Sequence, residues 1–417
     1  MAQTGSAPAS TAALSPAVAP PPGQPRFALF DALRGIAVLC IITYHVTSIT
    51  GAMNAATIGD LYSVLGNQAL IFFFVISGFL LYRPYAAAHA AGRRGPSTRR
   101  YARRRLLRIV PAYWTALTLL AIWPGITGVF THDWWRYYFC LQAYSNQTLS
   151  FGIPPAWSLT VEVSFYILLP IWAWAIRSLG RRLGASRWMR VELTGLALVA
   201  ALGVGIQVAA SRLLVSSLLA TTLLGECVWL ALGMALAVVS VEDQHRATPR
   251  RVVAAVVRFP GLCWLGALAC LLGATAVLHP GGLFNIILSL HERQPYSRTL
   301  AGIVLTAGLS AFLIAPAAFG EGAGGVPRRI LAWRPLAGLG VVSYGVYLYH
   351  LTAGELLGEK ADPLHFSASG LGLTSNTVLL FVLTVGVTAA VATVSYRVIE
   401  LPFLRLKEGP ARDGGAQ

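Results

Sequence analysis

Charged residues are scarce in this chain of 417 residues: Asp, Glu, Lys and Arg make up 12% of it, whereas 56% is hydrophobic. Soluble domains carry about 25% charged residues, so the composition argues against a water-soluble globule. Negatively charged residues are fewer than positively charged ones, with 16 Asp and Glu against 32 Lys and Arg. A basic balance also suits nucleic-acid binding, but that needs a solvated basic surface. Here the charges form short islands between long apolar runs, which indicates a polytopic membrane protein without a nucleic-acid partner.

Cysteine is sparse too, and its pattern excludes two further classes. The five cysteines are scattered and odd in number, so they indicate neither a disulfide framework nor a metal site. Residues 1–25 contain no Lys or Arg and are rich in Ala, Pro and Ser, which is unlike a signal peptide. We predict a disordered cytoplasmic tail over 1–27, a transmembrane domain over 28–400 and a short cytoplasmic tail over 401–417. We expect no metal and no bound cofactor.

Ten apolar runs are long enough to cross a membrane, because about 20 helical residues span a hydrocarbon core of about 30 Å. The runs cover 29–50, 66–84, 107–128, 156–176, 191–211, 215–240, 260–279, 299–319, 335–356 and 373–397. No internal repeat is detected, although many transporters have one. The sequence therefore predicts an all-α polytopic transmembrane helix bundle.

The basic residues sort to one side of the membrane. With ten spans both termini lie on the same side, and 27 of the 32 Lys and Arg residues fall there. Cytoplasmic loops carry such an excess, so we expect cytoplasmic termini and a multi-pass protein of the inner (plasma) membrane. The exceptions, on the outer side, are Arg136, Arg212, Arg293, Arg298 and Lys360.

The first span contains ionisable side chains, which are expensive in hydrocarbon unless they are paired or hydrated. Arg34 and His45 are separated by three helical turns plus about 20°, so they share one face about 16 Å apart. Asp31 precedes Arg34 by three residues and can pair with it. This face is a candidate site. The alternative is an interfacial ion pair and a structural histidine.

The fourth span contains Glu162, about 7 Å deeper than Trp157 at its outer end. Ser158 and Tyr166 lie four residues to either side of Glu162 and share its face. We expect Glu162 and His45 at similar depth, where a carboxylate beside an imidazole can form an acid–base pair. In the alternative, Ser158 or Tyr166 satisfies the carboxylate and no chemistry follows.

Three other segments supply candidates. In the ninth span Tyr347 and His350 share a polar stripe, as a second part of the site or as structural packing. Arg105 and Arg108 stand three residues apart at the cytoplasmic surface, where two guanidinium groups can meet one pyrophosphate; lipid binding and topology are the alternative roles. Ser77, in an apolar helix, permits close contact with a helix or with a thin ligand chain.

Taken together, these segments resemble the acyltransferase 3 family of integral membrane acyltransferases. The resemblance runs through six segments in order: FDALRGIAVLCIITYHV, FFFVISGFLL, RRRLLRIVPAYW, PAWSLTVEVSFYILLP, SYGVYLYH and YRVIELP. The first contains the family's Arg-x10-His signature and the third its Arg-x-x-Arg stretch. The positions that match family motifs include Arg34, His45, Ser77, Arg105, Arg108, Ser158 and Glu162.

The resemblance implies transfer of an acyl group, commonly acetyl, from cytoplasmic acyl-CoA to an acceptor hydroxyl. The family's essential histidine and glutamate carry over to His45 and Glu162, and its arginines to Arg34, Arg105 and Arg108. The chain ends shortly after its last span, as in relatives without a fused extracytoplasmic SGNH-type domain. Expected partners are acyl-CoA, membrane lipid, and a glycan, glycolipid or glycosylated small molecule as acceptor.

The resemblance and the polar residues together suggest a mechanism. His45, oriented by Glu162, removes the proton from the acceptor hydroxyl as it attacks the thioester; a covalent acyl-histidine is an alternative. Two rival functions remain: a proton-coupled transporter or flippase that uses His45 and Glu162 as a relay, and a non-catalytic membrane anchor. The acceptor pocket is expected in the outer loops 129–155, 280–297 and 357–372.

Overall fold

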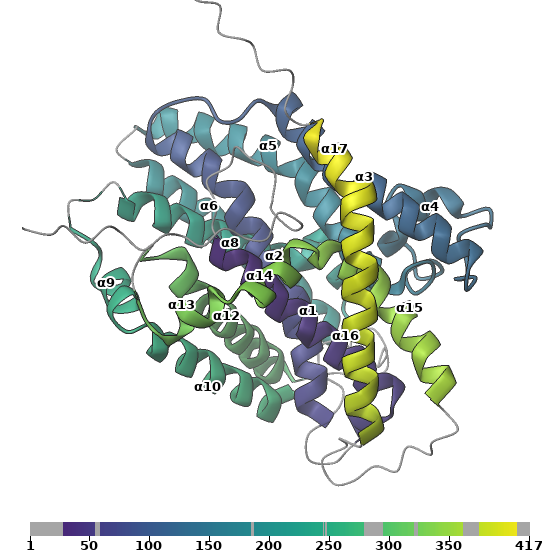
Figure 1. Cartoon of the computed structure of the whole chain (residues 1–417). Coiled ribbons are helices and arrows are strands. Elements are labelled where there is room, and N and C mark those ends of the chain that lie inside the picture. The colour runs from purple at the N-terminus through teal and green to yellow at the C-terminus, as the bar shows by residue number, and fades with distance from the viewer. Residues whose placement is uncertain are drawn as a thin grey trace, which may run out of the picture.

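A computed structural model describes residues 28–54, 59–184, 187–244, 246, 248–278, 295–320, 324–361 and 375–406 (Figure 1). Its regular secondary structure is helical throughout these ranges, as the sequence predicts. The main helices of the first half are α1 (Ala28–Ile49), α2 (Gly59–Ala90), α3 (Thr98–Ile122), α4 (Trp134–Tyr138), α5 (Trp157–Leu183) and α6 (Trp188–Ser211). Those of the second half are α7 (Ser217–Ala220), α8 (Leu223–Gln244), α9 (Arg251–Arg258), α10 (Pro260–Leu278), α12 (Tyr296–Ala318), α13 (Val326–Leu331), α14 (Arg334–Val341), α15 (Ser343–Ala361), α16 (Ser375–Ser395) and α17 (Leu401–Arg405).

The membrane-spanning helices agree in number with the ten apolar runs. Within the described ranges nine helices are long and apolar enough to cross a membrane, and counting α14 with α15 as one bent span gives ten. The fifth and sixth spans are separate, because α6 ends at Ser211 and the next span begins at Ser217. The predicted tail 1–27 and most of the predicted outer loops 280–297 and 357–372 lie outside the described residues.

The ninth predicted span, 335–356, is broken. α14 and α15 meet at an angle of 80° across Val342. α14 lies close against α1: a Cβ atom on Gly340 would lie 1.6 Å from the Asp31 carbonyl oxygen, and one on Gly35 would lie 2.3 Å from that of Leu336. Only glycine allows backbones so near to each other.

The last span is longer than predicted. After α16 the chain continues through a π-helical turn, η6 (Tyr396–Glu400), into α17, so the span runs over Asn376–Arg405 rather than 373–397. Figure 1 shows these elements as one continuous helix in yellow. The wider π turn precedes Pro402, which lacks the N–H that an uninterrupted α-helix needs.

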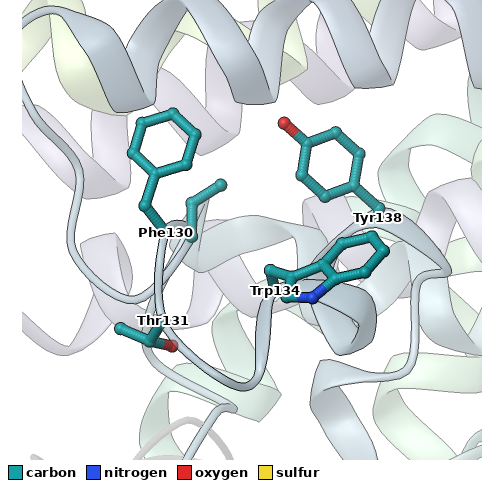
Figure 2. Close-up of a pocket in the computed structure, with 5 residues that line it drawn as sticks. Phe130, Thr131, Trp134 and Tyr138 are labelled. Carbon is teal, nitrogen blue, oxygen red and sulfur yellow. The ribbon is translucent and has the colours of Figure 1, made fainter.

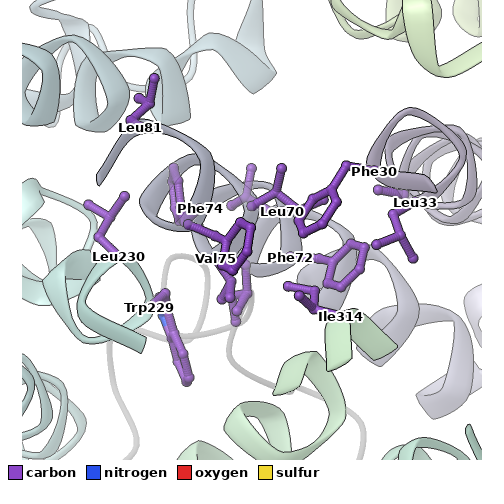
Figure 3. Close-up of a cluster of buried hydrophobic side chains, with 14 of the residues drawn as sticks. Phe30, Leu33, Leu70, Phe72, Phe74, Val75, Leu81, Trp229, Leu230 and Ile314 are labelled. Carbon is purple, nitrogen blue, oxygen red and sulfur yellow. The ribbon is translucent and has the colours of Figure 1, made fainter. Parts of the chain in front are cut away.

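α2 is the most buried span, and its most extensive contact is with α8. Their backbones meet at glycines: a Cβ atom on Gly78 would lie 2.3 Å from the Leu230 oxygen, and one on Gly233 would lie 2.0 Å from the Val75 oxygen. Figure 3 shows the apolar core around them, with Phe30 and Leu33 from α1, several residues of α2, Trp229 and Leu230 from α8, and Ile314 from α12. This packing fixes α1, α2 and α8 as a frame for the polar residues.

Candidate functional site

The ion pair predicted on the first span forms. Arg34 Nη1 donates to Asp31 Oδ1 at 2.9 Å, and both side chains remain partly exposed, at 18% and 19%. Three residues separate them on α1, so the pair is a local consequence of helical geometry.

Glu162 joins two helices through its carboxylate. Ser77 on α2 donates to Oε1 at 2.9 Å, and Tyr166 on α5 itself donates to Oε2 at 2.8 Å. The bond to Tyr166 confirms the shared face that the four-residue spacing predicts. The bond to Ser77 was not predicted, since its partner lies on another span and no sequence spacing connects them.

Arg105 and Arg108 lie half-buried beside this carboxylate. The Arg105 guanidinium stands 5.8 Å from the ring centre of Tyr166 and 5.8 Å from that of Tyr101. The charge of Arg34 interacts with those of Arg108, Asp31 and Glu162, and the charge of Arg105 interacts with those of Arg108 and Glu162. Three guanidinium groups and two carboxylates leave this arginine cluster with an excess of one positive charge, which suits an anionic ligand.

The second part of the site is a pair of imidazoles. The rings of His45 on α1 and His350 on α15 have their centres 5.0 Å apart at 54°. His350 Nδ1 lies 2.9 Å from the Tyr347 carbonyl oxygen and 3.2 Å from that of Val346. Carbonyls only accept, so Nδ1 carries the hydrogen and Nε2 of the neutral ring has a free lone pair.

The two histidines differ in access. His350 is 1% exposed, and its Nε2 has no hydrogen-bond partner among the described residues. His45 is only half-buried. His45 is therefore the more exposed of the two rings, and His350 packs against it from α15.

Ser158 lies four residues before Glu162 on α5, but within the described residues no hydrogen bond joins the two. Its hydroxyl lies 2.8 Å from the Tyr347 hydroxyl and 3.1 Å from the Pro155 carbonyl oxygen. Ser158 and Tyr347 therefore join the start of α5 to α15. Tyr347 in turn lies close enough to Glu162 for an electrostatic interaction.

The predicted contact between His45 and Glu162 is absent from the described part of the chain, where no hydrogen bond joins them and the carboxylate is bonded to Ser77 and Tyr166 instead. The ring that packs on His45 from another helix is that of His350. Glu162 interacts electrostatically with Arg34, which lies about 16 Å from His45 along α1, so the similar depth expected for Glu162 and His45 is wrong as well. Glu162 belongs to the arginine cluster rather than to the imidazole pair.

An aromatic pocket opens in the predicted outer loop 129–155. It has a volume of about 430 Å³ and is lined by Val129, Phe130, Thr131, Trp134 and Tyr138 (Figure 2). Trp114 on α3 donates to the Tyr138 carbonyl oxygen at 2.8 Å, which fixes the loop to the bundle.

The chain was compared with families and individual proteins. A family model described as an acyltransferase domain, Acyl_transf_3, matches residues 27–397. The chain belongs to the acyltransferase 3 family. A search of curated proteins and a search of solved structures returned no significant match. Family membership and the apolar helices identify a multi-pass membrane acyltransferase. The acyltransferase 3 domain covers α1 to α16, so it contains both the arginine cluster and the imidazole pair.

Proposed function

We propose that this acyltransferase moves a short acyl group, acetyl by default, from cytoplasmic acyl-CoA to a hydroxyl of a sugar-containing acceptor. The observation that carries the proposal is the arrangement on α1, where Arg34 lies in a cationic cluster and His45 lies about 16 Å further along the same face beside a second imidazole. Acyl-CoA has its negative charges at the nucleotide end and its thioester at the end of a thin arm. The arginine cluster suits the anionic nucleotide end, and the imidazole pair suits the thioester end.

In this mechanism Arg34, Arg105 and Arg108 hold the anionic end of the donor. His45 accepts the proton of the acceptor hydroxyl while the oxygen attacks the thioester carbonyl. The new C–O bond forms, the C–S bond breaks, and the proton passes to the departing thiolate to give free CoA. His350 supports the His45 ring from its buried side. Glu162 acts from the arginine cluster, where it orders Ser77 and Tyr166 and limits the excess of positive charge.

The acceptor is proposed to bind on the outer side of the inner membrane. Support comes from the pocket of Phe130, Trp134 and Tyr138, because exposed aromatic rings can stack on the apolar faces of sugar rings. A cell-envelope glycan and a glycosylated natural product both present such rings with free hydroxyls.

The test is release of free CoA thiol by purified protein given acetyl-CoA and a panel of sugars, glycolipids and glycosylated small molecules. We expect acceptor-dependent release that His45→Gln reduces by at least about 100-fold, the lower end for a lost general base. Ser178→Ala is the control, because Ser178 on α5 is bonded to the Trp174 carbonyl oxygen of its own helix and lies outside both the imidazole pair and the aromatic pocket. Full activity of a folded His45→Gln protein would overturn the mechanism. If the wild type does not bind CoA, the proposal that acyl-CoA is the donor is wrong and the transporter function is favoured.

A further inference from the structure

Two buried tyrosines lie at the cytoplasmic ends of neighbouring helices, outside the set of residues used above to hold the donor. Tyr85 is in the last turns of α2 and Tyr101 in the first turn of α3, with exposed fractions of 4% and 8%. Both hydroxyl oxygens are buried, and neither has a hydrogen-bond partner in the described ranges. Burial of an unpaired hydroxyl is costly, so two together at one place indicate a missing partner.

Arg105 adds a third unpaired donor to this place. The rings of Tyr85 and Tyr101 meet edge to face with their centres 6.1 Å apart. The Arg105 guanidinium lies 5.8 Å from the Tyr101 ring centre, and its charge acts on Tyr85. Its Nε is buried and has no partner among the described residues. Two hydroxyls and one N–H therefore share a small buried region at the Arg105 guanidinium.

The neighbouring carboxylates are already engaged. Glu162 accepts from Ser77 and Tyr166 with its two oxygens, and Asp31 is bonded to Arg34. The arginine cluster as a whole keeps one uncompensated positive charge. A set of donors around a cation is satisfied by an acceptor with negative charge and several oxygens, and a phosphate or diphosphate has this chemistry.

We infer that Tyr85 and Tyr101 are phosphate-binding residues that donate, together with Arg105, to the diphosphate oxygens of the acyl donor. The inference rests on the proposed function, since it names further residues of the same donor site. Both tyrosines lie at the membrane face that the basic loops mark as cytoplasmic, which is the face where acyl-CoA arrives. An anionic lipid headgroup offers the same phosphate oxygens and is the other source to be distinguished.

The test compares CoA with pantetheine, which has the same thiol arm but no phosphate. Affinities are measured by calorimetry on purified protein with the variants Tyr85→Phe and Tyr101→Phe. Each variant removes one oxygen that has no partner in the described part of the chain, so we expect unchanged or higher melting temperatures without ligand. CoA binding should weaken about 10- to 150-fold per hydroxyl, from a charge-assisted hydrogen bond of about 1.5–3 kcal/mol. Pantetheine binding should not change.

The control variant is Tyr144→Phe, which removes an exposed hydroxyl bonded to Ser164 on the outer side. Equal CoA affinity in the wild type and both phenylalanine variants would overturn the inference and leave the proposed function standing. No CoA binding by the wild type would overturn the proposed function itself. To test whether an anionic lipid headgroup is the ligand, melting temperatures are measured in nanodiscs of phosphatidylglycerol and of phosphatidylcholine. A stabilisation by phosphatidylglycerol that the variants lose, with unaltered CoA binding, would assign the tyrosines to lipid.

Discussion

The bond between Ser77 and Glu162 ties two helices together inside the site, and it can be tested by the variant Glu162→Gln. The carboxylate accepts one hydroxyl on each oxygen. An amide of the same shape has one oxygen, so its NH₂ group faces the second hydroxyl and that hydroxyl loses its acceptor. A hydrogen bond to a charged group contributes about 1.5–3 kcal/mol, so E162Q should lower the free energy of unfolding by about that amount.

A double-mutant cycle isolates this contact from other effects of the substitution. Ser77→Ala, Glu162→Gln and the double variant are compared by denaturant unfolding in detergent, with kcat/KM for thiol release as a second readout. If Ser77 donates to Glu162, Ser77→Ala costs less in the E162Q background than in the wild type, with a coupling of about 1 kcal/mol or more. Ser178→Ala is the control, because Ser178 on α5 is bonded to the Trp174 carbonyl and not to Glu162.

Additive effects within about 0.5 kcal/mol would refute the reasoning, since residues without contact add within that margin. The two readouts also separate two roles for Glu162. Loss of stability with unchanged kcat/KM assigns it to helix packing alone. A fall in kcat/KM beyond the loss of folded protein assigns it to the arginine cluster that is proposed to hold the donor.

Two further predictions concern the α1–α14 contact and a thiol. Gly340→Ala should lower the free energy of unfolding by at least about 1–3 kcal/mol, because its Cβ atom would overlap the Asp31 carbonyl. Gly338→Ala on the same helix meets nothing within 4 Å and should be neutral or stabilising, so equal melting temperatures for the two variants would contradict the close approach. Burial raises the pKa of Cys140 in the outer loop to about 12, so only about one thiol in 10⁴ is ionised at pH 8. Cys140 should therefore resist N-ethylmaleimide in the folded protein and react after unfolding. Rapid labelling of the native protein, followed by mass spectrometry, would show that the thiol is exposed.

The sequence alone was sufficient to predict features that depend on interactions within a single helix. The apolar runs give the number of spans because each span must bury its own backbone in lipid. Helical spacing gives the Arg34–Asp31 pair and the Glu162–Tyr166 bond, since both partners lie within one turn of each other.

Sequence was insufficient where two spans must be placed against each other. Ser77 and Glu162 are 85 residues apart, and the sequence of neither helix indicates which of its faces meets the other helix. The predicted pairing of His45 with Glu162 was wrong because Glu162 lies with Arg34 and Arg105, and His350 stands beside His45 instead. Hydropathy does not predict the bend at Val342. A glycine indicates a close approach between two helices only when the residue that it meets on the other helix is known.

The α1–α14 contact has a consequence for the order in which the protein is made. α1 is the first helix of the described chain, whereas α14 and α15, which pack against its two ends, lie some three hundred residues later. At about 5–20 residues per second, synthesis takes about 15–60 s to deliver them. During that interval His45 remains in the translocation machinery or the bilayer without His350, whereas Arg34 already has Asp31 on its own helix. An imidazole in the first span therefore lacks its neighbour until the chain is nearly finished, and truncation before α14 should yield a protein that is degraded rather than a partial enzyme.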